Sequence, residues 1–77
     1  PTPIDSFTLN ANATSTTLID ARIGYYSHVT FMPQTADAAA VASSLWAPQS
    51  QQISGQLVVE HESTANTDCT FRVLIWG

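Results

Sequence analysis

His61 stands between Glu60 and Glu62, and this arrangement comes nearest in the chain to acid-base or metal chemistry. Histidine titrates near neutral pH and is a common metal ligand. In a strand, however, successive side chains point to opposite faces, so the imidazole points away from both carboxylates. No second His or Cys lies at the spacing of a metal-ligand pair, and the other histidine, His28, is far from His61 in the sequence. We therefore expect no metal and no cofactor, with His28 either structural or at a subunit contact.

The candidate nucleophiles are equally unsupported by their surroundings. Cys69 is the only cysteine, and only Arg72 lies near enough in sequence to lower its pKa, so a buried inert thiol is expected. Serine, histidine and aspartate all occur, but no Gly-x-Ser-x-Gly elbow does. We predict no catalytic residues and no enzyme activity. A small hydrolase stays as an alternative, and it would need a pocket that joins His28 or His61 to an acid.

Charge excludes several classes of partner. Arg22 and Arg72 are the only basic residues, and the net charge is −4. Nucleic-acid binding needs clustered Lys and Arg to replace counterions on phosphate, so no direct nucleic-acid role is expected. Anionic membrane surfaces are disfavoured for the same reason, and no apolar segment approaches a membrane span.

Length favours assembly. A chain of 77 residues makes one domain. A domain this short buries a modest fraction of its surface and usually needs disulfides, a metal or oligomerisation. With a single cysteine and no metal site, oligomerisation is the route left.

The elements that position these residues are mostly strands. Residues 1–5 contain two prolines and predict an extended N-terminal arm, with residues 6–77 as one β-rich domain. Strand patterns occupy residues 6–9, 14–20, 25–32, 53–62 and 69–76. The last two are expected to pair as an antiparallel hairpin through the loop at 63–68.

One short helix is expected at about residues 36–46. Thr35 is a candidate N-cap, Asp37 complements the helix dipole, alanines favour the helix, and Pro48 ends it. The fold class is therefore mainly β: a small antiparallel β-sandwich or barrel-like domain with this one α-helix.

The final strand carries the main functional question. Phe71, Val73 and Ile75 share one face, but Leu74 and Trp76 make the other face apolar too. Either the chain covers this strand on both sides, or the second face waits for another subunit. The interface candidates are Met32, Leu74, Trp76 and Trp46. For the two tryptophans, a place in the core is the competing interpretation.

Several segments resemble short proteins encoded among the virion genes of tailed bacteriophages. These segments are Thr16–Arg22, Phe31–Ala40, Val59–Phe71 and Ile75–Gly77, within a similarity that covers about residues 14–77. His61, Asp68, Thr70, Phe71 and Gly77 fall at matching positions. Cys69 replaces a more usual basic residue, and Trp76 replaces a small aliphatic residue. The resemblance implies a structural component of the virion and supplies no catalytic residues.

We therefore expect a non-enzymatic virion protein, a capsid decoration or head-fibre protein. It would assemble as a homo-oligomer, with a trimer favoured, and contact other virion proteins such as the major capsid protein. Apolar faces would pack between subunits, and the N-terminal arm would dock on the shell. The alternative is a receptor- or glycan-binding tip module of a tail fibre, with Tyr25, Tyr26 and Trp46 as exposed aromatic residues in a groove.

Overall fold

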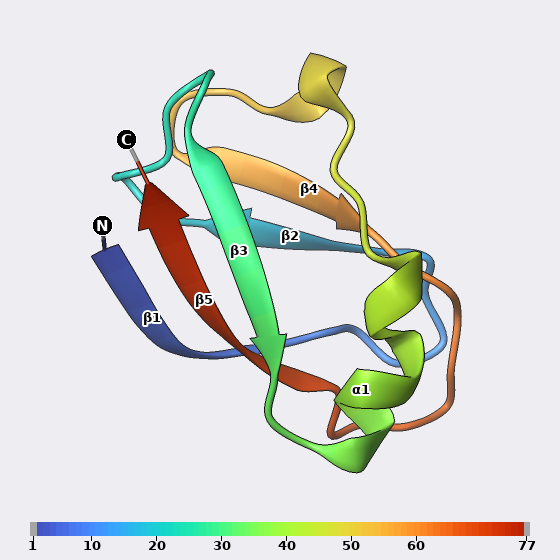
Figure 1. The fold of residues 1–77 in the computed structure, drawn as a ribbon. Helices are drawn as coiled ribbons and strands as arrows, with labels where there is room; N and C mark the ends of the chain where they lie inside the picture. Colours follow the sequence, from blue (N-terminus) through green and yellow to red (C-terminus); the bar gives the residue numbers. More distant parts are fainter. Residues whose placement is uncertain (1, 77) are drawn as a thin grey trace.

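The computed structural model describes residues 2–76 as two packed sheets with a short helix beside them (Figure 1). One sheet has three strands, with the C-terminal strand at its centre, and the other sheet has two. All the pairings are antiparallel. The fold is a β-sandwich-like globule, as predicted, and the barrel-like alternative is wrong because the two sheets do not close on each other.

The three-stranded sheet has the C-terminal strand at its centre. β5 (Thr70–Trp76) pairs with β1 (Thr2–Thr8) along one edge and with β3 (His28–Pro33) along the other. A central strand has both rows of backbone groups paired, which suits an apolar, β-branched sequence. Strand β3 was expected to begin at Tyr25. It begins at His28, because Gly24 and Ser27 close a turn through hydrogen bonds in both directions.

The predicted N-terminal arm is part of this sheet. Residues 2–5 are extended, as Pro3 favours, but they form the first half of β1 and pair with β5. Pro3 is tolerated because β1 is an edge strand, where a missing N–H breaks no ladder. Pro1, the first residue of that expected arm, lies outside the described residues.

The second sheet corrects the predicted hairpin. β4 (Gln56–Glu60) pairs with β2 (Ser15–Ile19), so it does not pair with β5. The loop at 63–68 instead carries the chain from one sheet to the other. Strand β4 begins three residues later than expected because Gly55 has a φ of 83°, a left-handed turn conformation that ends an extended run.

The helix begins where predicted and ends early. In α1 (Ala36–Val41), the Thr35 hydroxyl accepts a hydrogen bond from the Ala38 N–H at 3.0 Å and donates one to the Asp68 carbonyl at 2.6 Å. A 3-10 turn over Ala42–Ser44 follows, so the helical segment ends two residues before the predicted end near residue 46. The Ser44 hydroxyl donates to the Val41 carbonyl at 2.7 Å, a local bond that competes with continued helix. A second 3-10 turn spans Gln49–Gln51.

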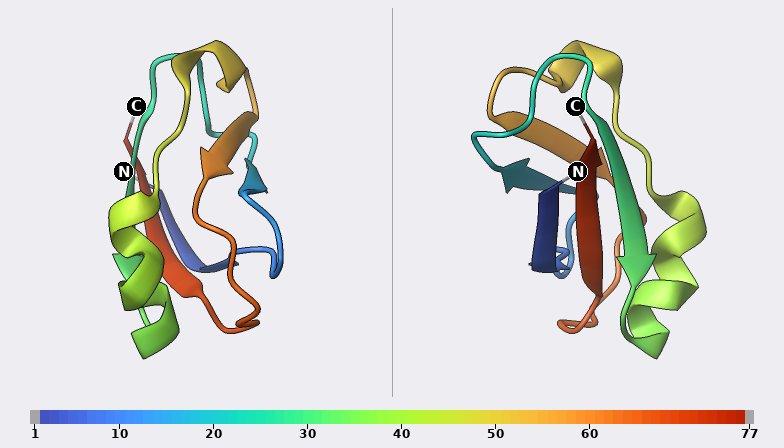
Figure 2. Two further views of the ribbon diagram at one scale, coloured as in Figure 1. Left: turned by 90° about the vertical axis from the view of Figure 1, so that its right-hand side faces the viewer. Right: turned by 60° about the vertical axis from the view of Figure 1, so that its left-hand side comes forward.

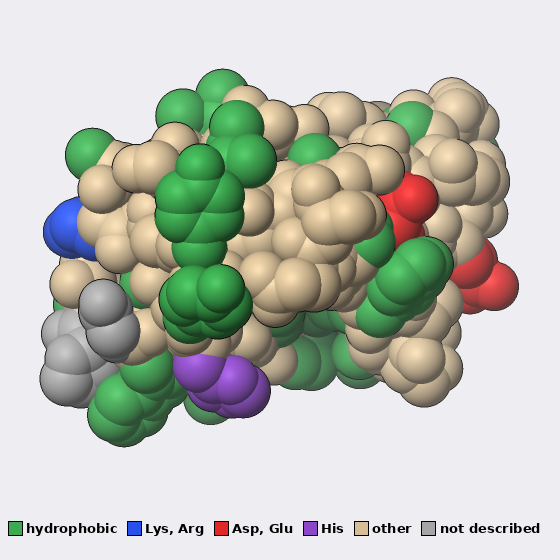
Figure 3. Space-filling model, turned by 90° about the horizontal axis from the view of Figure 1, so that it is seen from above, with side chains coloured by type: hydrophobic (Ala, Val, Ile, Leu, Met, Phe, Trp, Pro, Cys, Tyr) green, Lys and Arg blue, Asp and Glu red, His purple; other side chains and the backbone are tan. Residues whose placement is uncertain are grey.

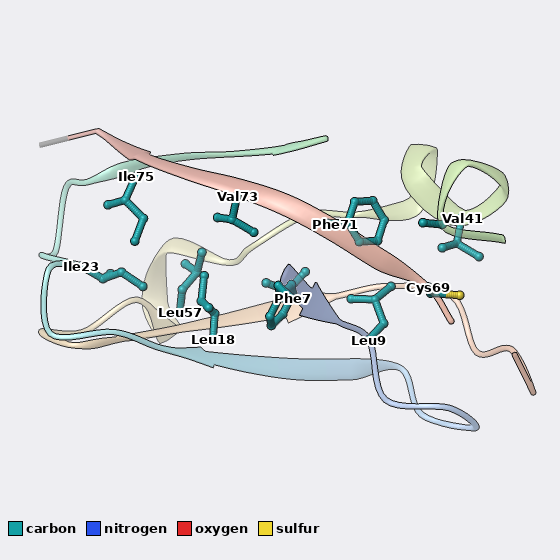
Figure 4. Close-up of a cluster of buried hydrophobic side chains, with 12 residues drawn as sticks. Phe7, Leu9, Leu18, Ile23, Val41, Leu57, Cys69, Phe71, Val73 and Ile75 are labelled. Atoms are coloured by element: carbon teal, nitrogen blue, oxygen red, sulfur yellow. The ribbon is translucent and has the colours of Figure 1, made fainter. Parts of the chain in front are cut away.

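The core lies between the two sheets (Figure 4). Phe71, Val73 and Ile75 point inward from β5 and are 0–2% exposed, which confirms the face predicted for this strand. Leu57 and Leu18 meet them from the second sheet, as Figure 4 shows. The remaining buried hydrophobic residues are Phe7, Leu9, Ile23, Ala38, Val41, Val59 and Cys69.

No helix within residues 2–76 has the length and apolar character needed to cross a membrane.

Candidate functional site

The outer side of the three-stranded sheet is open to solvent. Strand alternation and register bring seven outward side chains together on what we call the outer face: Pro3, His28, Thr30, Met32, Arg72, Leu74 and Trp76. Leu74 stands at the centre, with Pro3 opposite it on β1 and Thr30 opposite it on β3. Figure 2 shows the two-stranded sheet on the other side and the helix at the sheet's edge, so no described element covers the outer face.

The outer face is apolar and slightly hollowed. Met32 is 53% exposed and Trp76 is 44% exposed, which is high for large hydrophobic side chains. A depression of about 220 Å³ lies between β1, β5 and β3 and includes Met32 and Leu74 in its lining. Arg72 is the one cation beside it and forms no ion pair within residues 2–76. The sequence left two explanations for the apolar second face of β5: cover by the chain itself, or contact with another subunit. Residues 2–76 do not cover this face, so the first explanation is excluded for the described part of the chain.

The fourth interface candidate lies elsewhere. Trp46 is 61% exposed, and its backbone exchanges two hydrogen bonds with Glu60 at 2.7 and 3.1 Å. It lines a groove of about 430 Å³ between β3 and residues 45–52, which we call the aromatic groove. Tyr26, 92% exposed, lines the same groove. Neither tryptophan is in the core, so the competing interpretation of both is wrong.

His61 is a structural residue of the interior. It is 5% exposed, and its Nδ1 lies 3.0 Å from the Glu62 carbonyl, which can only accept. Nδ1 therefore carries the proton, and Nε2 accepts a hydrogen bond from the Thr16 hydroxyl at 2.8 Å. The same Thr16 oxygen accepts from the Asn10 N–H at 2.8 Å. His61 thus ties β2 to the segment after β4.

Replacing Thr16 with valine should destabilise the protein by about 1–3 kcal/mol, because it leaves the Asn10 N–H and His61 Nε2 without partners. Thr17→Val is the matched control, since Thr17 is exposed on the same strand. Its free energy of unfolding should stay within about 0.5 kcal/mol of the parent. Urea denaturation followed by tryptophan fluorescence measures both. If both variants lost the same free energy of unfolding, the Thr16 hydrogen bonds to Asn10 and His61 would not be what stabilises the fold.

The thiol and the acids near the helix do not form a catalytic arrangement. Cys69 is fully buried, and burial, followed by the nearby Asp37 and Asp68 carboxylates, raises the pKa of its thiol. A hydrogen bond with Asp68, together with the repulsion between the two carboxylates, raises the pKa of Asp37. A protonated, inaccessible thiol is a poor nucleophile. Within residues 2–76, no three His, Cys, Asp or Glu side chains converge to hold a metal ion.

Asp20 and Arg22 form the one ion pair of the described residues, at 2.6 Å. The guanidinium binds both carboxylate oxygens, and the Arg22 N–H also donates to Asp20 Oδ1. These hydrogen bonds lower the pKa of Asp20 from 3.8 to about 2. The pair holds the turn that follows β2.

Because the carboxylate is charged at a lower pH in the folded protein than in the unfolded chain, its stabilising effect is complete above about pH 4 and disappears as the pH falls through about 2. Asp20→Asn should therefore lower the melting temperature at pH 7, and the difference from the parent should shrink between pH 4 and pH 2. Asparagine keeps an oxygen for the Arg22 N–H, so the comparison isolates the charge. Differential scanning calorimetry across pH measures it, and a difference that does not change with pH would contradict this assignment.

Comparison with known proteins does not name a relative. No family model matches the chain, and neither the curated proteins nor the solved structures include a match.

Sequence reasoning missed part of this surface. It named Met32, Leu74, Trp76 and Trp46 as interface candidates, and the structure places the first three on the outer face. For the tail-fibre alternative it named Tyr25, Tyr26 and Trp46 as groove residues, and the structure places Tyr26 and Trp46, but not Tyr25, in the lining of the groove. It also missed Gln49 and Gln52, which line the groove. Their polar residue type gave no signal, because polar residues are the ordinary content of a linker.

Proposed function

We propose that this protein is a non-enzymatic structural component of a tailed-phage virion, a capsid decoration or head-fibre protein that assembles as a homotrimer. Its work is done at interfaces: copies of the chain pack through the outer face, and the assembled trimer contacts other virion proteins such as the major capsid protein. The virion assignment rests on the sequence resemblance, and the assembly mechanism rests on the outer face.

The observation that carries the mechanism is the uncovered apolar face of β1-β5-β3. Met32, Leu74 and Trp76 are grouped there on rigid strands, with no described element over them. Grouped exposed apolar side chains mark interaction sites in soluble proteins, and buried tryptophans are frequent anchors of interfaces. Leu74 lies at the centre of the face, where a contact is best shielded from water.

Low charge is consistent with close packing of many copies. Charged residues make up 10% of the sequence, and ordinary soluble domains have about 25%. The face drawn in Figure 3 accordingly shows few acidic or basic side chains. Fewer charges mean less repulsion and less desolvation cost when identical surfaces meet. The shell contact expected from a free arm at residues 1–5 is revised, because residues 2–5 belong to β1; the shell is contacted by the folded surface instead.

Quantitative mass spectrometry of purified particles of the virus that encodes this chain tests the virion assignment. Hundreds of copies per particle are expected for a decoration or head-fibre protein. A few copies would favour the tail-tip alternative, and absence from the particle would contradict a structural role in the virion.

A further inference from the structure

The aromatic groove lies beside the outer face, and His28 is the residue that belongs to both. It runs between β3 and residues 45–52, with the buried Leu57 and the half-buried Val29 and Phe31 in its lining. Tyr26 and Trp46, both exposed, bring aromatic rings to it. Its volume of about 430 Å³ lies within the range of about 300–1,000 Å³ that small ligands occupy.

The lining carries no carboxylate, ammonium or guanidinium group. Its residues are Tyr26, Ser27, His28, Val29, Phe31, Leu45, Trp46, Ala47, Gln49, Gln52 and Leu57. Arg22 and Arg72, the only cations of the chain, are not among them. An anionic ligand would find no fixed positive charge there and would meet a protein of net charge −4. The groove therefore suits an uncharged ligand.

Two side-chain amides in the groove are held in place by their nitrogens. Gln52 Nε2 donates to the carbonyls of Gly24 at 2.6 Å and Ser27 at 3.1 Å, and Gln49 Nε2 donates to the carbonyl of Tyr25 at 2.8 Å. Carbonyl oxygens only accept, so these contacts fix which end of each amide is the nitrogen. Neither Oε1 makes a hydrogen bond to another residue in the part of the chain described. Both oxygens are pre-positioned acceptors for a ligand that donates.

A binding site for a neutral sugar combines exposed aromatic rings with fixed hydrogen-bond acceptors and has no charged lining residue. The C–H faces of a pyranose ring pack on the face of Trp or Tyr, and its hydroxyl groups donate to amide oxygens. We propose that the aromatic groove binds a neutral saccharide, with Trp46 and Tyr26 as stacking surfaces and Gln49 and Gln52 as hydrogen-bond acceptors. Of the lining residues, His28 is shared with the outer face, whereas the proposed sugar contacts of Trp46, Tyr26, Gln49 and Gln52 do not depend on the assembly role.

Binding to a glycan array tests the proposal, provided that the array carries neutral hexoses, N-acetylhexosamines and deoxyhexoses beside sialylated and sulfated glycans. Neutral glycans should be bound and anionic ones should not. Titration of ¹⁵N-labelled protein with the best neutral sugar should then shift the amide signals of residues 26–29 and 45–52 saturably. Failure to bind any neutral glycan, or binding of anionic glycans alone, would overturn the assignment.

Substitutions of the two groove aromatic residues test whether the sugar binds in the aromatic groove. Trp46→Ala and Tyr26→Ala should each weaken binding of that sugar at least tenfold, and both side chains are exposed enough for the fold to survive their loss. Ile19→Ala is the matched control, because Ile19 is a 76% exposed hydrophobic residue away from the groove. Unchanged affinity in both aromatic variants would overturn the assignment. Leu74→Glu should leave affinity for the free sugar unchanged, which separates this site from the assembly surface.

Discussion

Replacing Leu74 with glutamate should convert the proposed oligomer into a monomer. Leu74 lies at the centre of the outer face, between Pro3 on β1 and Thr30 on β3. A carboxylate there would be buried without a partner in each subunit of an assembly. Loss of an apolar anchor at the centre of an interface costs about 2 kcal/mol or more, and an unpaired buried charge adds to it. Because every subunit carries the change, the effect is repeated at each contact.

Ile19→Glu provides the control for this experiment. Ile19 is 76% exposed on β2, in the other sheet. Its substitution also replaces an aliphatic side chain with a carboxylate, but on a surface that takes no part in the proposed interface. Light scattering should give a monomer for Leu74→Glu and the parent mass for Ile19→Glu. Trp76→Ala should weaken the assembly less than Leu74→Glu does, because it removes an anchor without burying a charge. A Leu74→Glu protein with the parent mass would contradict the interface.

The largest loss of stability should come from Phe71→Ala. The Phe71 ring is fully buried where β5 meets the helix and the second sheet, and it packs edge-on against Phe31 with ring centroids 6.2 Å apart. Truncation of a buried phenylalanine costs about 3–5 kcal/mol through lost burial and the cavity left behind. A domain of this length has roughly 4–12 kcal/mol of stability in total, so the variant should be marginally folded.

Urea denaturation measures this loss, and Phe31→Leu serves as the comparison. Phe31 is only partly buried, and leucine retains most of its apolar volume, so its loss should be under about 1.5 kcal/mol. Phe71→Leu should fall between the two variants. A loss below about 1 kcal/mol for Phe71→Ala would show that the core is not organised around β5.

Local patterns in the sequence predicted local structure well. The alternation at Phe71, Val73 and Ile75 identified the inward face of β5, and Thr35 marked the start of the helix. Both signals depend on neighbours within a few residues, where side-chain spacing and capping are direct consequences of backbone geometry.

Strand partners could not be predicted in the same way. Alternation in β4 and β5 shows which face of each strand is buried, but it does not say which strand lies beside it. Adjacency along the chain favoured pairing these two, whereas the long loop at 63–68 lets β4 pair with β2 in the other sheet. The exposure of Trp46 and Trp76 depends on the same long-range arrangement of strands. The sequence alone therefore could not decide whether either tryptophan lies in the core or at an interface.

The groove is also a product of tertiary structure. Tyr26 and Trp46 are twenty positions apart and meet because the free edge of β3 faces the segment at 45–52. Gln49 and Gln52 acquire their role only when the loop carbonyls of Gly24, Tyr25 and Ser27 hold their nitrogens. The aromatic residues were candidates for a groove from the sequence, but no pattern along the chain indicates that the two glutamines converge with them.

The native mass in solution is the most direct test of the central claim that the outer face is a subunit interface. Light scattering on a sizing column should give three times the 8.3 kDa of one chain. A mass of one chain across the accessible concentration range would mean that Leu74, Met32 and Trp76 stay in water without a partner subunit, and it would contradict assembly through the outer face.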